Sequence, residues 1–389
     1  MSCRFTMLTA AAAGVTLALV PAGPAAAQVP DTVVDVHFNY TQERENNYGG
    51  RNETLAIMKA AQGLMNRAHA ESGTGIQYNY VLPTKVNYNA DSSTNNALSD
   101  LRFNRIPGIH GRRDRLGTDM IAINASIRAA GVAYTTYRQT FAVRFLSGPA
   151  TAHEVGHTLG CGHGGIAGDG GQGDRGYARG WAFRDAGGKR FGTVMTGAQI
   201  VRFSSPRLTF RGRTIGIANK ADNLRRIRET RREQSRIRNL NPAAAGAGQR
   251  WYVRTRAGGQ ALESEANRRN NGTNIKLWPF RSSAPHHAWN FENAPTGGFV
   301  KLRNASTRGY LDVAGVSRAT SANVQQWGNN GSRGNQELRV RGNGAGFHKF
   351  QFRHSGHWLT AVTDRRGANV VQRLDRGLPT QDWWLTSPY

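Results

Sequence analysis

The feature that most limits how this chain can fold is an internal repeat in its last third. Three copies each place an asparagine before a short apolar run, at Asn274, Asn323 and Asn369, and these asparagines stand 49 and 46 residues apart. A repeat of this length cannot bury its apolar face alone, so neighbouring copies must pack together. We therefore expect residues 249–389 to fold as one unit built from three similar parts.

The middle copy shows the repeat most clearly, with Asp312 after Tyr310-Leu311 and Trp327 after Gln325-Gln326. The three copies resemble a ricin-type β-trefoil lectin, whose repeats carry a Gln-x-Trp mark. The resemblance implies an all-β trefoil that binds carbohydrate. Sugar binding needs a carboxylate and amides to hold hydroxyl groups, and an aromatic face under the C–H bonds of the ring. By this resemblance the middle copy has the complete set: Asp312, Gln325, Trp327, Asn335 and Gln336.

The outer copies depart from this set. The first has Glu263 and Trp278 but Lys276 in place of the glutamine, and the third has Thr360 and Arg373 where the acid and the aromatic would stand. We expect a complete sugar site in the middle copy, an altered one in the first and none in the third. The alternative is that the tryptophan and glutamine marks serve only the core of the domain.

An eleven-residue segment from His153 to His163 has the pattern of a metal site. On a helix, His153 and His157 lie one turn apart on one face, so both imidazoles can reach one metal ion, and Glu154 lies beside them where it can take a proton from water. Gly160 can end the helix in a left-handed turn that brings His163 back as a third ligand. Three protein nitrogens and a water are the open coordination of a catalytic zinc.

The spacing H-E-x-x-H-x-x-G-x-x-H resembles the metzincin clan of zinc endopeptidases, in which a methionine turn follows. Met195 is the only methionine after His163 and stands where that turn would be. The resemblance implies that Met195 forms a hydrophobic floor beneath the metal. The alternatives are an ordinary core methionine and, for the eleven residues, an amphipathic helix with surface histidines.

Strands and helices are expected to alternate in the first part of the chain. Strand patterns occupy residues 31–39, 76–86, 118–124 and 140–146, and a helix pattern occupies residues 52–70 before the histidine helix begins near Pro149. This order predicts an α/β sheet flanked by helices over residues 28–240, and hence a multidomain chain. It resembles the bacterial metzincins related to the adamalysins and reprolysins, including the peptidyl-Asp metallopeptidase group.

The N-terminus has the pattern of an export signal. An apolar run at residues 7–20 is followed by the small-residue cleavage site Ala25-Ala26-Ala27. The run is short and stops at Pro21, which favours a removed signal peptide over a membrane span. We expect residues 1–27 to be this signal, and the mature protein to be secreted, extracellular and without a membrane span. The first expected strand follows so closely that no inhibitory pro-segment fits between them.

The chain is strongly basic, with 51 lysine and arginine residues against 25 acidic ones and a formal net charge of +26. This balance favours anionic partners: acidic peptides, anionic cell-wall polymers or nucleic acid. The densest basic run, residues 224–238, has a narrow apolar stripe that includes Leu224 and Ile227 and is typical of a solvated helix. A nucleic-acid site is the alternative, although no aromatic residue lies in this run for base stacking.

Three smaller features of the sequence are a glycine-rich loop, a single cysteine after the expected signal and a segment rich in alanine and glycine. The glycine-rich loop at residues 164–176 holds Asp169 and Asp174, so a Ca²⁺ site there is the alternative to a flexible rim of the cleft. Cys161 is the only cysteine after the signal, and we expect a small packed residue that forms no intramolecular disulfide. Residues 241–248 have the composition of an interdomain linker.

These features together predict a secreted, Zn²⁺-dependent endopeptidase that cleaves protein or peptide substrates and is directed to glycans or cell-wall polysaccharide by its lectin domain. His153, His157 and His163 would hold the zinc, and Glu154 would move the proton during hydrolysis. Two alternatives remain open. One is a lectin or adhesin with an inert protease domain, and the other is a basic secreted protein that binds anionic polymers or nucleic acid.

Overall fold

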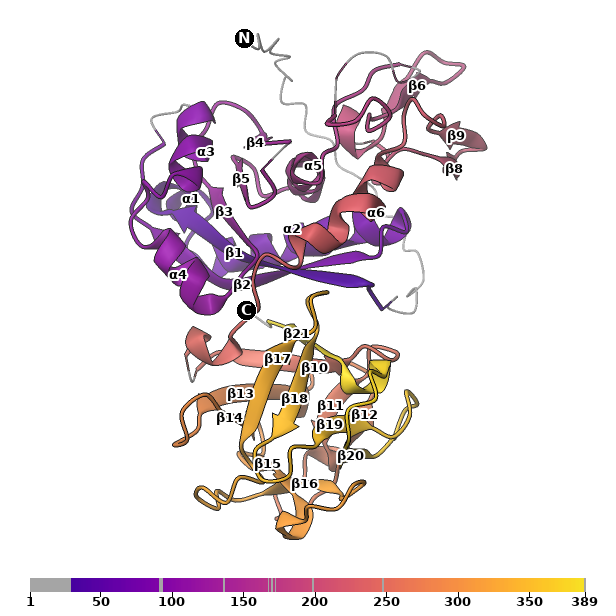
Figure 1. Cartoon of the computed structure of the whole chain (residues 1–389). Helices are drawn as coiled ribbons and strands as arrows, with labels where there is room; N and C mark the ends of the chain where they lie inside the picture. The colour runs from indigo at the N-terminus through magenta and orange to yellow at the C-terminus, as the bar shows by residue number, and fades with distance from the viewer. Residues whose placement is uncertain are drawn as a thin grey trace.

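The computed structural model forms a mixed α/β domain followed by a β-rich domain (Figure 1). It describes residues 29–90, 94–135, 137–166, 168, 171, 173–197, 199–246 and 248–387. The expected signal peptide, residues 1–27, lies outside these residues. None of the helices in the described part of the chain is long and apolar enough to cross a bilayer.

A mostly parallel sheet forms the centre of the N-terminal domain. Its strand order is β2-β1-β3-β5-β4, and only β4 runs antiparallel to its neighbour. The strands are β1 (Thr32–Thr41), β2 (Ile76–Val86), β3 (Met120–Asn124), β4 (Gly131–Ala133) and β5 (Thr140–Val143). The four expected strands are all present, whereas β4 is too short to show an alternating pattern in the sequence.

Helices cover both faces of this sheet. On one face, α2 (Arg51–Glu71) and α5 (Gly148–Thr158) bury Met58, Met65 and Val155 against the apolar side chains of β1, β2 and β5. On the other face lie α3 (Thr94–Arg102) and α4 (Ile109–Leu116), while the short α1 (Gln42–Asn47) follows β1 directly. The layered arrangement confirms the expected mixed α/β content of this part of the chain.

The segment that follows α5 forms two small hairpins and a helix. The elements are β6 (Ala182–Arg184), β7 (Arg190–Gly192), a 3-10 turn at Val194–Thr196, β8 (Ser205–Phe210), β9 (Arg213–Ile215) and α6 (Asn223–Gln234). The helix α6 buries Leu224 and Ile227, as expected from the apolar stripe, but it ends at Gln234 rather than at residue 238. Its arginines are partly used in ion pairs, such as that of Arg231 with Asp31 at 2.8 Å.

The C-terminal domain is built only from strands and short 3-10 turns within the described residues. Its strands are β10 (Arg250–Thr255), β11 (Ala261–Ser264), β12 (Ile275–Trp278), β13 (Ala288–Asn293), β14 (Val300–Asn304), β15 (Tyr310–Val313), β16 (Val324–Trp327), β17 (Leu338–Gly342), β18 (His348–Phe352), β19 (Trp358–Ala361), β20 (Val370–Arg373) and β21 (Trp383–Thr386). The 3-10 turns lie at Glu265–Asn267, Pro285–His287, Ala314–Val316 and Pro379–Gln381. All strand pairs of this sheet are antiparallel.

The three asparagines of the repeat meet in a hydrogen-bonded ring. Asn274 Nδ2 donates to Asn369 Oδ1 at 2.9 Å, Asn369 Nδ2 to Asn323 Oδ1 at 2.9 Å, and Asn323 Nδ2 to Asn274 Oδ1 at 3.1 Å. Each side-chain amide thus gives one hydrogen bond and accepts one. The repeat read from the sequence is therefore a real threefold arrangement around a common centre.

The two domains share an apolar core at their junction. Val81 and Leu116 from the N-terminal domain belong to the same buried cluster as Trp251 of the C-terminal domain. The segment with linker composition is part of this junction: Pro242–Ala245 form a 3-10 turn with Ala243 buried in that cluster. Its alanines supply small apolar contacts, so the segment is packed rather than flexible, which the composition did not predict.

Candidate functional site

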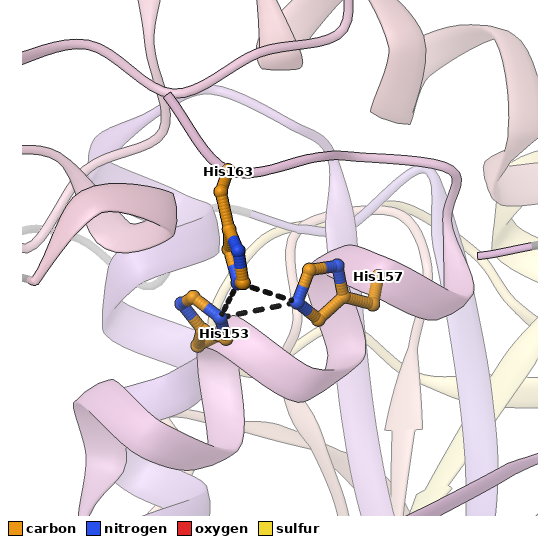
Figure 2. Close-up of side chains that lie close together, drawn as sticks. All are labelled: His153, His157 and His163. Atoms are coloured by element: carbon orange, nitrogen blue, oxygen red, sulfur yellow. Dashed lines mark hydrogen bonds between the residues drawn. The ribbon is translucent and has the colours of Figure 1, made fainter. Parts of the chain in front are cut away.

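The helix α5 and the turn that ends it bring three imidazoles to one point (Figure 2). The Nε2 atoms of His153 and His157 lie 3.1 Å apart, and His163 Nε2 lies 2.9 Å from the first and 3.1 Å from the second. Gly160 makes the necessary turn at φ +92°, a conformation open to glycine at little cost. The three predicted metal ligands therefore converge as the spacing required.

The hydrogen bonds of the rings determine where their protons lie. His153 Nδ1 faces the carbonyl oxygen of Val194 at 2.9 Å, and His157 Nδ1 faces that of Cys161 at 2.8 Å. A carbonyl only accepts, so each Nδ1 carries the proton, and in the neutral rings each Nε2 presents a lone pair. The Nε2 atoms of His153 and His157 are 3.1 Å apart, and their lone pairs repel each other unless a cation lies between them. The three imidazoles therefore fit a divalent metal ion such as zinc.

The protein environment keeps these rings neutral. Loss of water around the ring lowers the pKa of His153 to about 4, with a further contribution from neighbouring His163. Desolvation also lowers the pKa of His157 well below its usual range and lowers that of His163. Neutral imidazole is the form that binds a metal.

Glu154 is held in a dry position next to the histidines in the chain. It is 5% exposed, its Oε2 has no hydrogen-bond partner, and burial raises its pKa to about 8. The edge strand β4 covers it: a Cβ added to Gly131 would lie 2.5 Å from Glu154 Cγ. A carboxyl group with a pKa near neutrality can both accept and release a proton. Gly131 gave no sequence signal, because its role depends on which strand lies beside α5.

Met195 is buried in the 3-10 turn Val194–Thr196, which lies against α5. A Cβ added to Gly156 would lie 2.5 Å from Met195 Sδ, so the two residues are in tight contact. The same turn supplies the Val194 carbonyl that orients His153. The turn therefore supports the face of α5 that carries the histidines, and the role of the Val194 carbonyl has no counterpart in the side-chain pattern.

The residues around the glycine-rich loop are used structurally. Arg226 donates to both carboxylate oxygens of Asp174, from Nε at 2.7 Å and from Nη2. Asp169, the other acid of the alternative Ca²⁺ site, lies outside the described residues. Cys161 is a fully buried free thiol whose pKa is raised by burial, in line with the expected packed residue.

The middle lectin repeat brings its predicted sugar ligands onto one carboxylate. Asn335 Nδ2 and Gln336 Nε2 donate to Asp312 Oδ2 at 2.8 and 3.0 Å, and Gln325 Nε2 donates to Oδ1 at 3.1 Å. Trp327 is 40% exposed at the end of the same strand as Gln325. All five predicted residues thus lie in or next to one polar cluster. Asn330, which also donates to Asp312 at 3.2 Å, was not predicted because it lies in an irregular loop.

The same pairing recurs in the other repeats with different chemistry. In the first repeat His287 Nε2 lies 2.9 Å from Glu263 Oε2, and in the third Gln381 Nε2 donates to Thr360 Oγ1 at 3.1 Å. The carboxylate is therefore kept in the first repeat and lost in the third, as the sequence predicted. The two histidines of the first repeat, His286 and His287, were not predicted.

Comparison with known proteins identifies part of the C-terminal domain. The family described as ricin-type beta-trefoil lectin domain-like matches residues 285–373. No curated protein matches the chain.

Several solved structures are similar to about a third of the chain. The designed threefold symmetric protein ThreeFoil is 29% identical, with a TM-score of 0.34, covering 35% of this chain and 97% of its own. An exo-beta-1,3-galactanase from Clostridium thermocellum is 23% identical, with a TM-score of 0.35, and the match covers 36% of this chain and only 30% of the galactanase. The Rhizoctonia solani agglutinin is 15% identical, with a TM-score of 0.32, covering 36% and 94%.

Proposed function

Because the C-terminal domain is a ricin B-type β-trefoil lectin domain, we propose that the protein is a secreted zinc-dependent endopeptidase of metzincin type that its lectin domain attaches to glycans. One observation carries the proposal. Three Nε2 atoms lie within 3.1 Å of one another while the Nδ1 protons of two rings are tied to carbonyl oxygens. A cation between the rings would remove the repulsion between the lone pairs of His153 and His157, and a buried glutamate follows the first histidine in the chain.

In this proposal His153, His157 and His163 hold the zinc, with the Val194 and Cys161 carbonyls fixing two of the rings. When bound, zinc supplies a Lewis acid that activates water and polarises the scissile carbonyl. Glu154 accepts a proton from the attacking water and passes it to the leaving nitrogen. Burial raises its pKa to about 8, a zinc ion beside it would favour the carboxylate form that accepts the proton, and Oε2 has no competing hydrogen-bond partner.

The middle lectin repeat would supply the attachment. Asp312 accepts hydrogen bonds from sugar hydroxyls, and Gln325 Nε2, which gives one N–H to Asp312, can donate the other to the same ligand, whereas Asn335 and Gln336 use both of theirs to hold the site. The exposed ring of Trp327 offers an apolar face to a sugar. The basic surface favours acidic peptides and anionic polymers as partners. The export pattern of residues 1–27 supports secretion.

The experiment that tests the proposal is digestion of casein and of a peptide library by the wild type and by Glu154→Gln, each with and without a chelator. We expect the variant to retain zinc while its hydrolysis falls by about 10² to 10⁴-fold, since only the proton carrier is lost. The chelator should abolish the wild-type activity, and added zinc should restore it. Equal hydrolysis by both proteins would refute the proposal.

A second candidate is a glycan-binding protein whose N-terminal domain is inert, and the family match favours it because that match concerns the lectin domain alone. The same experiment separates the two candidates. If zinc is bound but no polypeptide in the library is cleaved, while the wild type and not Asp312→Ala binds a glycan array, the second candidate is the better description.

A further inference from the structure

The first lectin repeat carries a second cluster of metal-binding side chains, where the middle repeat has its sugar-binding amides. Glu263, His286 and His287 stand 49 residues before Asp312, Asn335 and Gln336. Their ligand atoms all lie within 4.8 Å of one another. Glu263 Oε2 lies 2.9 Å from His287 Nε2 and 3.3 Å from His286 Nε2, so both rings point at one carboxylate oxygen.

The surroundings of this cluster do not suit a neutral sugar. Lys276 Nζ lies 4.6 Å and Arg366 Cζ lies 4.1 Å from the ring of Trp278, so cations occupy the aromatic surface that a sugar would use. In the middle repeat Trp327 is instead 40% exposed. The imidazoles of His286 and His287 also stand where the middle repeat has the amides of Asn335 and Gln336, which donate to the carboxylate of Asp312. The first repeat has therefore kept the geometry of the site and changed its chemistry.

His286 has no satisfactory neutral form in this environment. If its proton lies on Nε2, where it can donate to Glu263, then the buried Nδ1 keeps a lone pair with no donor, because Nδ1 has no hydrogen-bond partner. If the proton lies on Nδ1, the lone pair of Nε2 faces the carboxylate oxygen at 3.3 Å. A cation bound to Nε2 removes the second conflict, since it attracts both the imidazole lone pair and the carboxylate, while the Nδ1 proton still has no acceptor among the described residues.

We propose that Glu263, His286 and His287 form a second zinc site, in the first lectin repeat. One carboxylate and two imidazoles are a typical donor set for Zn²⁺, with water completing the coordination. His286 is 21% exposed, which gives the ion a path from solvent, whereas Glu263 and His287 are 3% and 1% exposed and hold fixed positions.

Two neighbouring groups must be accommodated. Lys276 lies 3.9 Å from Glu263 but 3.1 Å from Glu265, so its ammonium group can remain with Glu265 when zinc occupies the site. His287 Nδ1 accepts a long hydrogen bond of 3.3 Å from the backbone N–H of Arg281. When zinc binds Nε2, the ring proton of His287 must lie on Nδ1, which can then no longer accept this hydrogen bond. The backbone of Arg281, a residue in an exposed loop, must therefore shift away from the ring.

The test is the zinc content of the full chain after equilibration with zinc chloride and dialysis, measured by atomic emission. The matched variant is His286→Asn with His287→Gln, because this pair already stands at the equivalent positions of the middle repeat and is compatible with the fold there. We expect the wild type to bind a second equivalent of zinc that this variant lacks. Glu263→Gln, which keeps the size of the side chain, should weaken that second equivalent by about tenfold or more.

A further variant, His153→Ala with His157→Ala, makes the result independent of the proposed protease site. It should retain the zinc ion bound by Glu263, His286 and His287 and lose the zinc ion of the proposed protease site. Cobalt substitution of this variant should give the visible absorption of a Co²⁺ ion held by nitrogen and oxygen. If the wild type and the amide variant bind equal amounts of zinc, the cluster is a hydrogen-bonded one only and the second site is refuted. If His153→Ala with His157→Ala leaves the zinc content unchanged, it is the protease site that fails.

Discussion

At the scale of single residues, buried histidines set how the fold responds to acid. Burial lowers the pKa of His37 and His348 to about 4 and that of His69 to about 3. An unfolded chain binds these protons near pH 6.5. The stability contributed by each neutral ring is therefore complete above pH 6.5 and is lost as the pH falls through 6.5 towards the folded pKa.

Replacing His348 by Gln should remove the part of the acid-induced loss of stability that this histidine causes. Between pH 7 and pH 5 the wild type should lose about 2 kcal/mol more of its free energy of unfolding than His348→Gln does, because only the wild type must exclude a proton from this position. The measurement is urea unfolding at both pH values, followed by tryptophan fluorescence. The same loss in both proteins would show that His348 is not the group that titrates.

The residues of the candidate sites differ in how far they could be predicted. The three histidines of the metal site and Glu154 stand at fixed spacings, so their pattern indicated them, and the resemblance to a lectin repeat indicated Asp312 and the four residues around it. The Val194 carbonyl that orients His153 is a backbone group, and Gly131 covers Glu154 only because β4 lies beside α5. His286 and His287 fill positions at which the lectin pattern has amides, so that pattern did not predict them.

At the level of elements, the support of α5 depends on two side chains that pack against a glycine of the helix. A Cβ at Gly156 would lie 2.5 Å from Met195 Sδ and 3.1 Å from Phe203 Cε1, so Gly156→Ala must displace the buried Met195 side chain, and we expect the turn Val194–Thr196 to shift with it. We expect this variant to lower the free energy of unfolding by about 1–3 kcal/mol and to weaken zinc binding, because the Val194 carbonyl moves with the turn.

The matched control is Gly63→Ala in the middle of α2. This glycine is also helical, but a Cβ there meets nothing within 4 Å. It should raise the free energy of unfolding by about 0.5–1 kcal/mol, as expected for alanine in a helix. Thermal unfolding and competition for zinc with a chromophoric chelator measure both effects. If the two variants behave alike, the contact between α5 and the methionine turn does not stabilise the site.

Sequence patterns were sufficient to predict the bounds of the longest elements. Long periodic segments such as β1, β2 and α2 were predicted within two residues of their bounds, since many side chains repeat the signal. The basic run was predicted to be helical beyond residue 234, but a run of arginines has no residue that marks an end. The 3-10 turn at Pro242–Ala245 has the composition of a flexible linker and becomes ordered only because the two domains close around it.

In the whole molecule, the proposed catalytic and glycan sites lie on elements at a distance from each other. The helix α5 lies in one domain, and β15 and β16, which carry Asp312 and Trp327, lie at the far end of the other (Figure 1). Two hydrogen bonds from backbone N–H groups fix the junction between them: Val33 N–H donates to Ala345 O at 3.0 Å, and Ser387 N–H donates to the side-chain oxygen Asn79 Oδ1 at 3.1 Å. A glycan-bound molecule would therefore hold its metal centre at a fixed distance from the glycan.

This rigidity depends on a glycine at the junction. Gly346 has φ +78°, and a Cβ there would overlap the carbonyl oxygen of Val33 in β1. Gly344, in the same loop, has φ +73°, but the nearest atom to its added Cβ is Arg236 Nε at 3.6 Å. Both alanine variants carry the cost of a left-handed backbone, about 1 kcal/mol, and only Gly346→Ala also pushes the domains apart.

We therefore expect the wild type and Gly344→Ala to unfold in a single calorimetric transition, because the apolar cluster around Val81, Leu116 and Trp251 belongs to both domains. Gly346→Ala should show two transitions, and a protease of unrelated specificity should cut it between residues 238 and 250 faster than it cuts Gly344→Ala. A single transition in Gly346→Ala, with cutting no faster than in its control, would mean that the contact between the loop and β1 does not hold the domains together.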